Sequence, residues 1–153
     1  MRVRLLSLAA LLVLPACGGD NGTGPPTFEN IAGTYAGALA GTAQGVVLAA
    51  TFSVTFTQSD GDLSGSWGLS GTLNDGISIV SIVGSGALTG TIASGQNPSI
   101  NITVTNPCPN YQAAFSGSLD SANNLITLSG PIDILDTNCV VVLTYPSIII
   151  LSR

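Results

Sequence analysis

The sequence predicts an all-β domain, an antiparallel meander of eight or nine short strands that closes into a small up-and-down barrel. Apolar and polar residues alternate, turn signals separate the alternating stretches at short intervals, and no window beyond the N-terminal apolar run has a 3.6-residue period. Nineteen glycines among 153 residues also favour strands and turns over helices. A β-sandwich made from the same strands is the alternative.

Short strands can be assigned along most of the chain. Residues 50–57 alternate without exception, so that Phe52 and Val54 share one side of a strand and Thr or Ser residues occupy the other. The last strand is expected to start near Cys139 and to break at Pro146. Two segments, 77–83 and 87–93, can also form one bent strand, which leaves the count at eight or nine. The expected strands are 32–40, 47–57, 63–72, 77–83, 87–93, 99–105, 111–119, 125–134 and 139–151.

A five-residue pattern recurs in the chain and favours the barrel. It reads apolar, small, Gly, small, apolar, and its central residues are Gly37, Gly65, Gly90, Gly117 and Gly130. A glycine in the middle of a strand weakens that strand, so its presence needs a structural reason. Sharp bending of a small closed sheet, or a large neighbour packed over the glycine, would supply one.

The charged residues exclude several classes of function. The chain has three basic residues, eight acidic residues and no His. Binding to nucleic acid and attraction to an anionic membrane surface both depend on Lys and Arg, so neither is expected. Catalysis by His-assisted nucleophiles and metal binding through His are excluded because the chain has no imidazole.

The first sixteen residues are expected to be an export signal. Arg2 and Arg4 precede an apolar stretch of about ten residues, too short to span a bilayer, and small residues follow it. The segment Leu14-Pro15-Ala16-Cys17 resembles the lipobox of bacterial lipoproteins. The resemblance implies cleavage before Cys17 and attachment of lipid, with acyl chains such as palmitate, at this cysteine. An ordinary secretory signal is the alternative.

The residues after Cys17 are expected to form a flexible tether. Residues 17–27 are rich in Gly and Pro and offer few apolar side chains for burial. The residue after the cysteine is Gly18 rather than Asp, which, by resemblance to this lipoprotein class, implies the outer membrane. The barrel domain is then 28–153, and the mature chain keeps one basic residue and eight acidic ones, a formal charge of −7.

Two further cysteines, Cys108 and Cys139, are expected to form a disulfide. An even pair in an exported protein favours a bridge over a metal site or a reactive thiol. One strand lies between the two residues, and strands two apart in a meander run in the same direction. Both cysteines should therefore lie at the same end of the sheet, where a bridge would stabilise the fold by about 2–4 kcal/mol.

Two short segments resemble the calycin barrels, the group that contains lipocalins and avidins. These are Gly33-Thr34-Tyr35 and the stretch 86–91, which reads Gly-Ala-Leu-Thr-Gly-Thr. The resemblance implies an eight-stranded barrel and, as one possible function, binding of a small apolar ligand. It carries over no binding residue, because avidin-like sites use several tryptophans and Trp67 is the only one here.

Few residues are candidates for chemistry. A ligand cavity, if the barrel has one, would be lined by Tyr35, Trp67, Tyr111 and Phe115, although these side chains suit an ordinary core better. Neither of two carboxylate pairs, Asp60 with Asp62 and Asp133 with Asp136, is accompanied by the further groups that calcium binding or glycoside hydrolysis needs. The pattern predicts no catalytic residue, no metal site and no cofactor.

We therefore expect a non-enzymatic, lipid-anchored protein of the bacterial cell envelope with a structural or interaction role. A calycin-like binder of a small apolar ligand is the alternative, and the interior volume of the barrel separates the two. A transmembrane barrel would need two aromatic girdles, and aromatic residues make up only 5% of the chain. The sequence identifies no protein or small-molecule partner.

Overall fold

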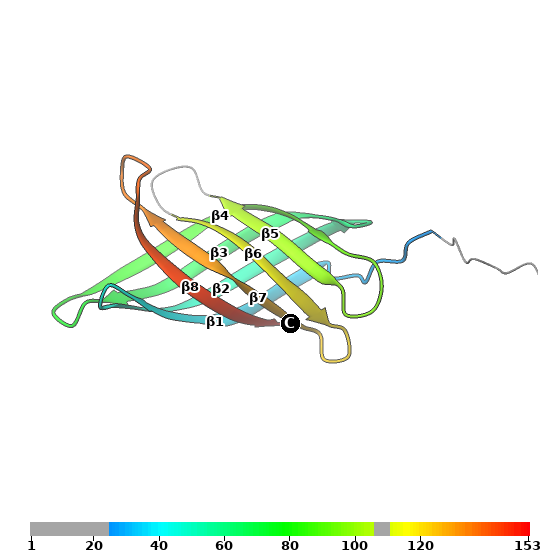
Figure 1. Cartoon of the computed structure of the whole chain (residues 1–153), viewed down its shortest axis with the longest axis horizontal. Helices are drawn as coiled ribbons and strands as arrows, with labels where there is room; N and C mark the ends of the chain where they lie inside the picture. The colour runs from blue at the N-terminus through cyan, green and yellow to red at the C-terminus, as the bar shows by residue number, and fades with distance from the viewer. Residues whose placement is uncertain (1–24, 106–110) are drawn as a thin grey trace, which may run out of the picture.

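Most strands of the protein turn their large apolar residues to one face of the sheet and their Ser and Thr residues to the other. In the computed structural model, which describes residues 25–105 and 111–153, this single amphipathic sheet closes on itself as a barrel (Figure 1). Its strands are β1 (Gly33–Ala43), β2 (Val46–Ser59), β3 (Asp62–Asn74), β4 (Ile79–Ile92), β5 (Ser99–Thr105), β6 (Tyr111–Asp120), β7 (Leu125–Leu135) and β8 (Val141–Ser152).

The strands follow one another around the barrel in chain order, and every neighbouring pair is antiparallel. The predicted meander and its closure as an up-and-down barrel are confirmed, and the sandwich alternative is wrong. The described residues contain no helix, as the absence of a 3.6-residue period predicts.

The segments 77–83 and 87–93 belong to one strand, β4, since β3 pairs with it continuously, so the alternative of one bent strand and a count of eight is confirmed. Two details of the predicted strands are wrong. Pro146 does not break β8, which stays paired with β7 on both sides of the proline, at Tyr145 and Ser147. Cys139 precedes β8 in a turn, where its positive φ of 65° is unsuited to a strand.

The inward-facing side chains fill the barrel. Twenty-six buried hydrophobic residues form one core cluster, to which every strand contributes. The N-terminal segment closes one end: Ile31 is fully buried, and its N–H donates to the Gln58 side chain at 2.8 Å. Phe28 packs beside it against the same core. The hydrophobic effect acting on one continuous interior therefore holds the sheet closed.

The first and last strands meet at a short seam. Ala36 and Ser152 are its paired residues. Beyond them the terminal Arg153 joins the two strands, since its guanidinium donates to the carbonyl oxygen of Ala32 at 2.6 Å and lies 5.0 Å from the centre of the Tyr35 ring. The one basic side chain that remains after the expected processing thus helps to close the barrel.

Two prolines face each other on neighbouring strands beside this seam. Pro131 on β7 pairs with Pro146 on β8, and neither has an N–H to donate. The pairing of β6 with β7 is interrupted at the same level, between Ala113–Ile132 and Ser116–Ser129. The hydrogen-bonded ladder is therefore interrupted between β6 and β7 beside Pro131, and side-chain packing contributes more to closure there.

The five glycines of the repeated pattern allow neighbouring strands to approach closely. A Cβ atom at Gly37, Gly65, Gly90, Gly117 or Gly130 would overlap a backbone carbonyl oxygen of the adjacent strand. A second device occurs at Gly84, where the Tyr111 and Trp67 rings pack over the glycine. Close backbone approach therefore explains the repeat, whereas the large neighbour expected from the sequence is found only over Gly84, outside the repeat.

We predict that Gly117→Ala lowers the free energy of unfolding by about 1–3 kcal/mol, because the new methyl group has no room beside the Thr127 carbonyl. Gly68→Ala is the matched control, since a Cβ there meets only the side-chain oxygen of Ser53, at 2.9 Å. Its effect should stay within about 1 kcal/mol of wild type. Denaturant unfolding of both variants tests this, and equal stabilities would contradict the account of the repeat.

Candidate functional site

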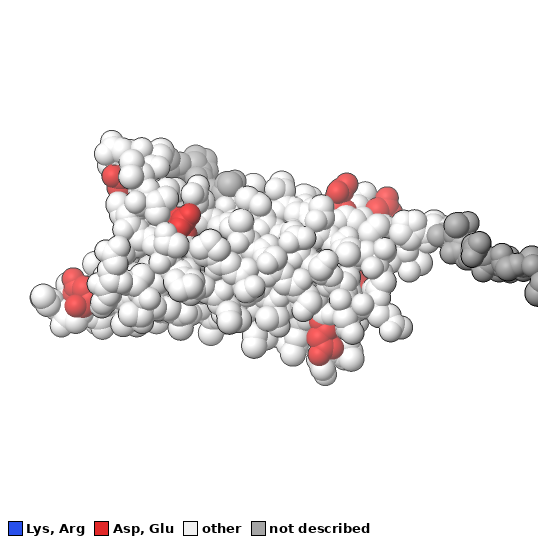
Figure 2. All heavy atoms as spheres, in the orientation of Figure 1, with Lys and Arg blue, Asp and Glu red and all other residues white. Residues whose placement is uncertain are grey.

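The barrel has two different ends. The terminal end carries both described chain termini, together with the β2–β3, β4–β5 and β6–β7 turns, and it lies to the right in Figure 1. The far end carries the β1–β2, β3–β4 and β7–β8 turns. The carboxylates gather toward these two ends, and the middle of the face seen in Figure 2 is uncharged.

Three of the four aromatic residues proposed as a cavity lining come together inside the barrel. Trp67 and Tyr111 meet edge to face with ring centres 6.2 Å apart, and Phe52 bridges Trp67 and Phe115 at 6.2 and 5.7 Å. Tyr35 is not part of this cluster, because it packs against Phe56 near the terminal end. The sequence pattern did not single out Phe52, although its place on the apolar side of an alternating strand marks it as inward-facing.

The space left within this cluster is too small for a ligand. The cavity beside Trp67, Tyr111 and Phe115 has a volume of about 10 Å³. Pockets for small molecules usually enclose about 300–1,000 Å³. The four aromatic residues therefore act as core side chains, and the interior expected for a calycin-like binder is occupied by the protein itself.

The most unusual buried group is the hydroxyl of Tyr145 on β8. The side chain is completely buried and its hydroxyl has no hydrogen-bond partner. Burial raises the pKa of Tyr145, so the group stays neutral. The neighbouring buried hydroxyl of Ser147 donates to the Tyr145 backbone carbonyl at 3.1 Å. An unsatisfied buried hydroxyl costs about 1–3 kcal/mol, and Tyr145 lines none of five pockets formed by the described residues.

The carboxylates at the ends of the barrel serve turns. Backbone N–H groups of Ser78 and Ile77 donate to Asp75 at 2.7 and 2.8 Å and hold its pKa below the ordinary value. The Asn123 side chain, at 2.8 Å, lowers the pKa of Asp120 in the same way. An exposed carboxylate that accepts hydrogen bonds from N–H groups of its own turn stabilises that turn.

The two carboxylate pairs considered for chemistry also lie in or beside turns. Asp60 occupies the β2–β3 turn with a φ of 52°, and Asp62 begins β3. Asp133 accepts from Thr144 at 2.7 Å, while N–H groups of Val140 and Asn138 lower the pKa of Asp136. Among the described residues, no group of three or more His, Cys, Asp or Glu side chains could hold a metal ion.

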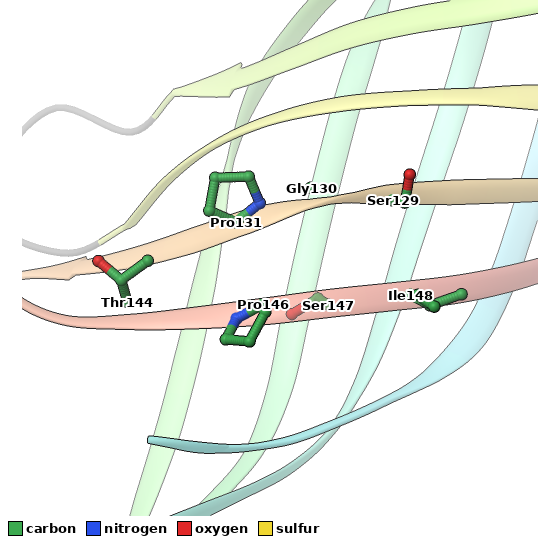
Figure 3. Close-up of a pocket in the computed structure, with 7 residues that line it drawn as sticks. All are labelled: Ser129, Gly130, Pro131, Thr144, Pro146, Ser147 and Ile148. Atoms are coloured by element: carbon green, nitrogen blue, oxygen red, sulfur yellow. The ribbon is translucent and has the colours of Figure 1, made fainter. Parts of the chain in front are cut away.

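A shallow groove of about 470 Å³ runs along the outside of β7 and β8 (Figure 3). Ser129 and Pro131 line it from β7, and Thr144, Pro146 and Ile148 line it from β8. The facing prolines Pro131 and Pro146 both line the groove. Its lining includes no ionisable group, so it offers no catalytic chemistry.

The cysteines are only partly within the described residues. Cys139 lies in the β7–β8 turn at the far end and is not a free thiol. Cys17 and Cys108 fall outside the described residues. The residues that flank Cys108 in the chain, Thr105 and Tyr111, belong to the far-end termini of β5 and β6, so the expected bridge remains compatible with the topology.

Exposed apolar side chains gather at the far end. We call them the far-end apolar surface, and they are Val47, Ile77, Ile79, Val80, Val83, Val140, Val141 and Val142. Ile77 and Val83 are 96% and 73% exposed, which is unusual for large apolar residues. Sequence reasoning missed this surface; the signal was the run 77–83, in which only two serines interrupt β-branched residues, so that both faces of the strand are apolar.

Comparisons with known proteins identify no relative. No protein-family model, curated protein or solved structure matches the chain. Within the described residues, no helix is long and apolar enough to cross a membrane. A function must therefore be inferred from the residues and the barrel alone.

Proposed function

We propose that the chain is a non-enzymatic, lipid-anchored protein of the bacterial cell envelope whose barrel has a structural or interaction role. The observation that carries the proposal is the filled interior, with a residual cavity of only about 10 Å³. A barrel without internal space can recognise partners only through its outer surface and its ends. This argues against the alternative, a binder of a small apolar ligand.

The two ends of the barrel suit an anchored interaction domain. The N-terminal segment approaches the terminal end, where the Gly95 N–H donates to the Thr27 carbonyl at 3.2 Å. A lipid on Cys17 would therefore hold this end nearest the membrane. The far-end apolar surface lies at the opposite end of strands as long as 14 residues, about 46 Å, and would face away from that membrane.

Lipid on Cys17, rather than the strands, is proposed as the membrane contact. Strands of a transmembrane barrel turn apolar residues outward to lipid. Here the outward rows include Thr51, Ser53, Thr55 and Thr57 on β2, and the apolar residues of that strand point inward. The outer membrane is the proposed location, because Gly18 rather than Asp follows the cysteine.

We also propose that the protein has no enzymatic activity, because several of its carboxylates accept hydrogen bonds within their own turns. The carboxylates of Asp75, Asp120 and Asp136 are engaged in their own turns. No described pocket combines an acid, a base and a nucleophile, the combination from which hydrolytic sites are built.

We predict that Cys17→Ser abolishes lipid labelling and releases the protein from membranes into the aqueous phase. Metabolic labelling with a palmitate analogue, followed by detergent partition, measures both effects. Cys108→Ser is the matched control and should keep label and partition unchanged, because it leaves the signal intact. Unlabelled wild-type protein, or a mature protein that starts at another residue, would refute the anchor.

We also propose that Cys108 and Cys139 are joined in the exported protein. The bridge would tie the β5–β6 connection to the β7–β8 turn, at the end of the β6–β7 ladder where Tyr111 pairs with Ile134. Its reduction should lower the free energy of unfolding by about 2–4 kcal/mol. Mass spectrometry of unreduced, alkylated protein tests the pairing, and two alkylated thiols in material from the cell envelope would refute it.

A further inference from the structure

The strand β4 extends beyond its neighbour β5. On one side β4 pairs with β3 from Ile79 to Thr91, but on the other side its pairing with β5 covers only Ala87–Ile92. No described residue pairs with the first half of β4 on the β5 side. The backbone N–H and C=O groups that point that way form a sheet edge, the usual template for an added strand.

Once the proposed signal is removed before Cys17, a step that rests on the proposed function, the parts of the same chain outside the described residues are too short to cover this edge. Five residues connect Thr105, the partner of Ala87, to Tyr111, so that connection can follow β4 for about three residues before it must return. Five residues are too few to reach Ile79–Val83 and return. The eight residues 17–24 span at most about 28 Å from the terminal end, less than the length of β4.

The edge lacks the devices that usually prevent strands from associating. Residues 79–83 read Ile-Val-Ser-Ile-Val, with no Lys, Pro or bulge. The outward side chains of Ile79 and Val83 are 69% and 73% exposed. A β-branched, uncharged and exposed edge of this kind is stable in solution chiefly when another strand covers it.

We propose that a second copy of this chain covers the edge, with residues 79–83 of the two copies paired antiparallel about Ser81. The segment is complementary to itself in this register. Ile79 then faces Val83 of the other copy, Val80 faces Ile82, and Ser81 faces Ser81. Each β-branched side chain meets a β-branched side chain, and the hydroxyls meet each other, which are favourable cross-strand pairs.

Charge permits this pairing despite the acidity of the chain. No charged residue occurs between Asp75 and Asp120, so the paired segments bring no carboxylates face to face. The edge has no carboxylate with which a basic partner could form an ion pair. Pairing with a second copy requires no ion pair. The symmetric arrangement also closes as a pair, because both copies use the same edge.

A cysteine at the centre of symmetry tests the register. The protein for this test is the mature chain from residue 17 with Cys17→Ser, so the outcome is independent of lipid anchoring. Directly opposite residues have Cβ atoms close enough for a disulfide, so Ser81→Cys should form a covalent dimer that reductant dissolves. The matched control is Thr89→Cys, exposed on the same strand where β5 covers the edge, and it should stay monomeric on a non-reducing gel.

Substitution of an exposed edge residue tests the interface without threatening the fold. Val83→Lys should weaken self-association measured by sedimentation at least tenfold, because it places two ammonium groups in the paired edge. Ile148→Lys is the control, a similarly exposed residue on β8, and should leave association unchanged. A monomeric wild type, a dimer unaffected by Val83→Lys, or equal cross-linking of both cysteine variants would each overturn the proposal.

Discussion

Closure of the sheet around an interior filled by its own side chains is the constraint on which the other features depend. Eight strands must curve enough for β1 to meet β8, and the apolar residues between them must fill the space that remains. Glycines allow the curvature because neighbouring backbones approach more closely than a Cβ atom permits. The Arg153 contacts and the short Ala36–Ser152 pairing then hold the two strands at the seam.

Because the closed barrel is filled by its own side chains, the proposed interaction role is assigned to its outer surface and its ends. A closed barrel has no free lateral edge except where one strand outruns its neighbour, as β4 outruns β5. Much of its outer surface is Ser, Thr and Ala, and Asp75, Asp120 and Asp136 are used in turns. The proposed recognition is therefore assigned to the far end, which is the end that a tether at Cys17 would present to other molecules.

The alternation of residues was sufficient to predict the meander, since period-two patterning determines which side chains face inward. Closure also followed, because the repeated glycines indicate sharp bending. The sequence left open whether β4 is one strand or two, because the small residues around Gly84 weaken the alternation. The large rings that cover this glycine come from Tyr111 and Trp67, far away in sequence. The uncovered edge escaped prediction for a similar reason, since it depends on the relative lengths of β4 and β5.

The central claim is that the barrel has no room for a ligand, and Trp67 reports on it directly. This residue is the only tryptophan, is 4% exposed and borders the residual cavity. Titration with a long-chain fatty acid, followed by Trp67 emission and thermal unfolding, is the most direct measurement. The account predicts an unchanged emission spectrum and an unchanged Tm. A saturable change in Trp67 emission with a rise in Tm would show an interior that binds ligand and would contradict it.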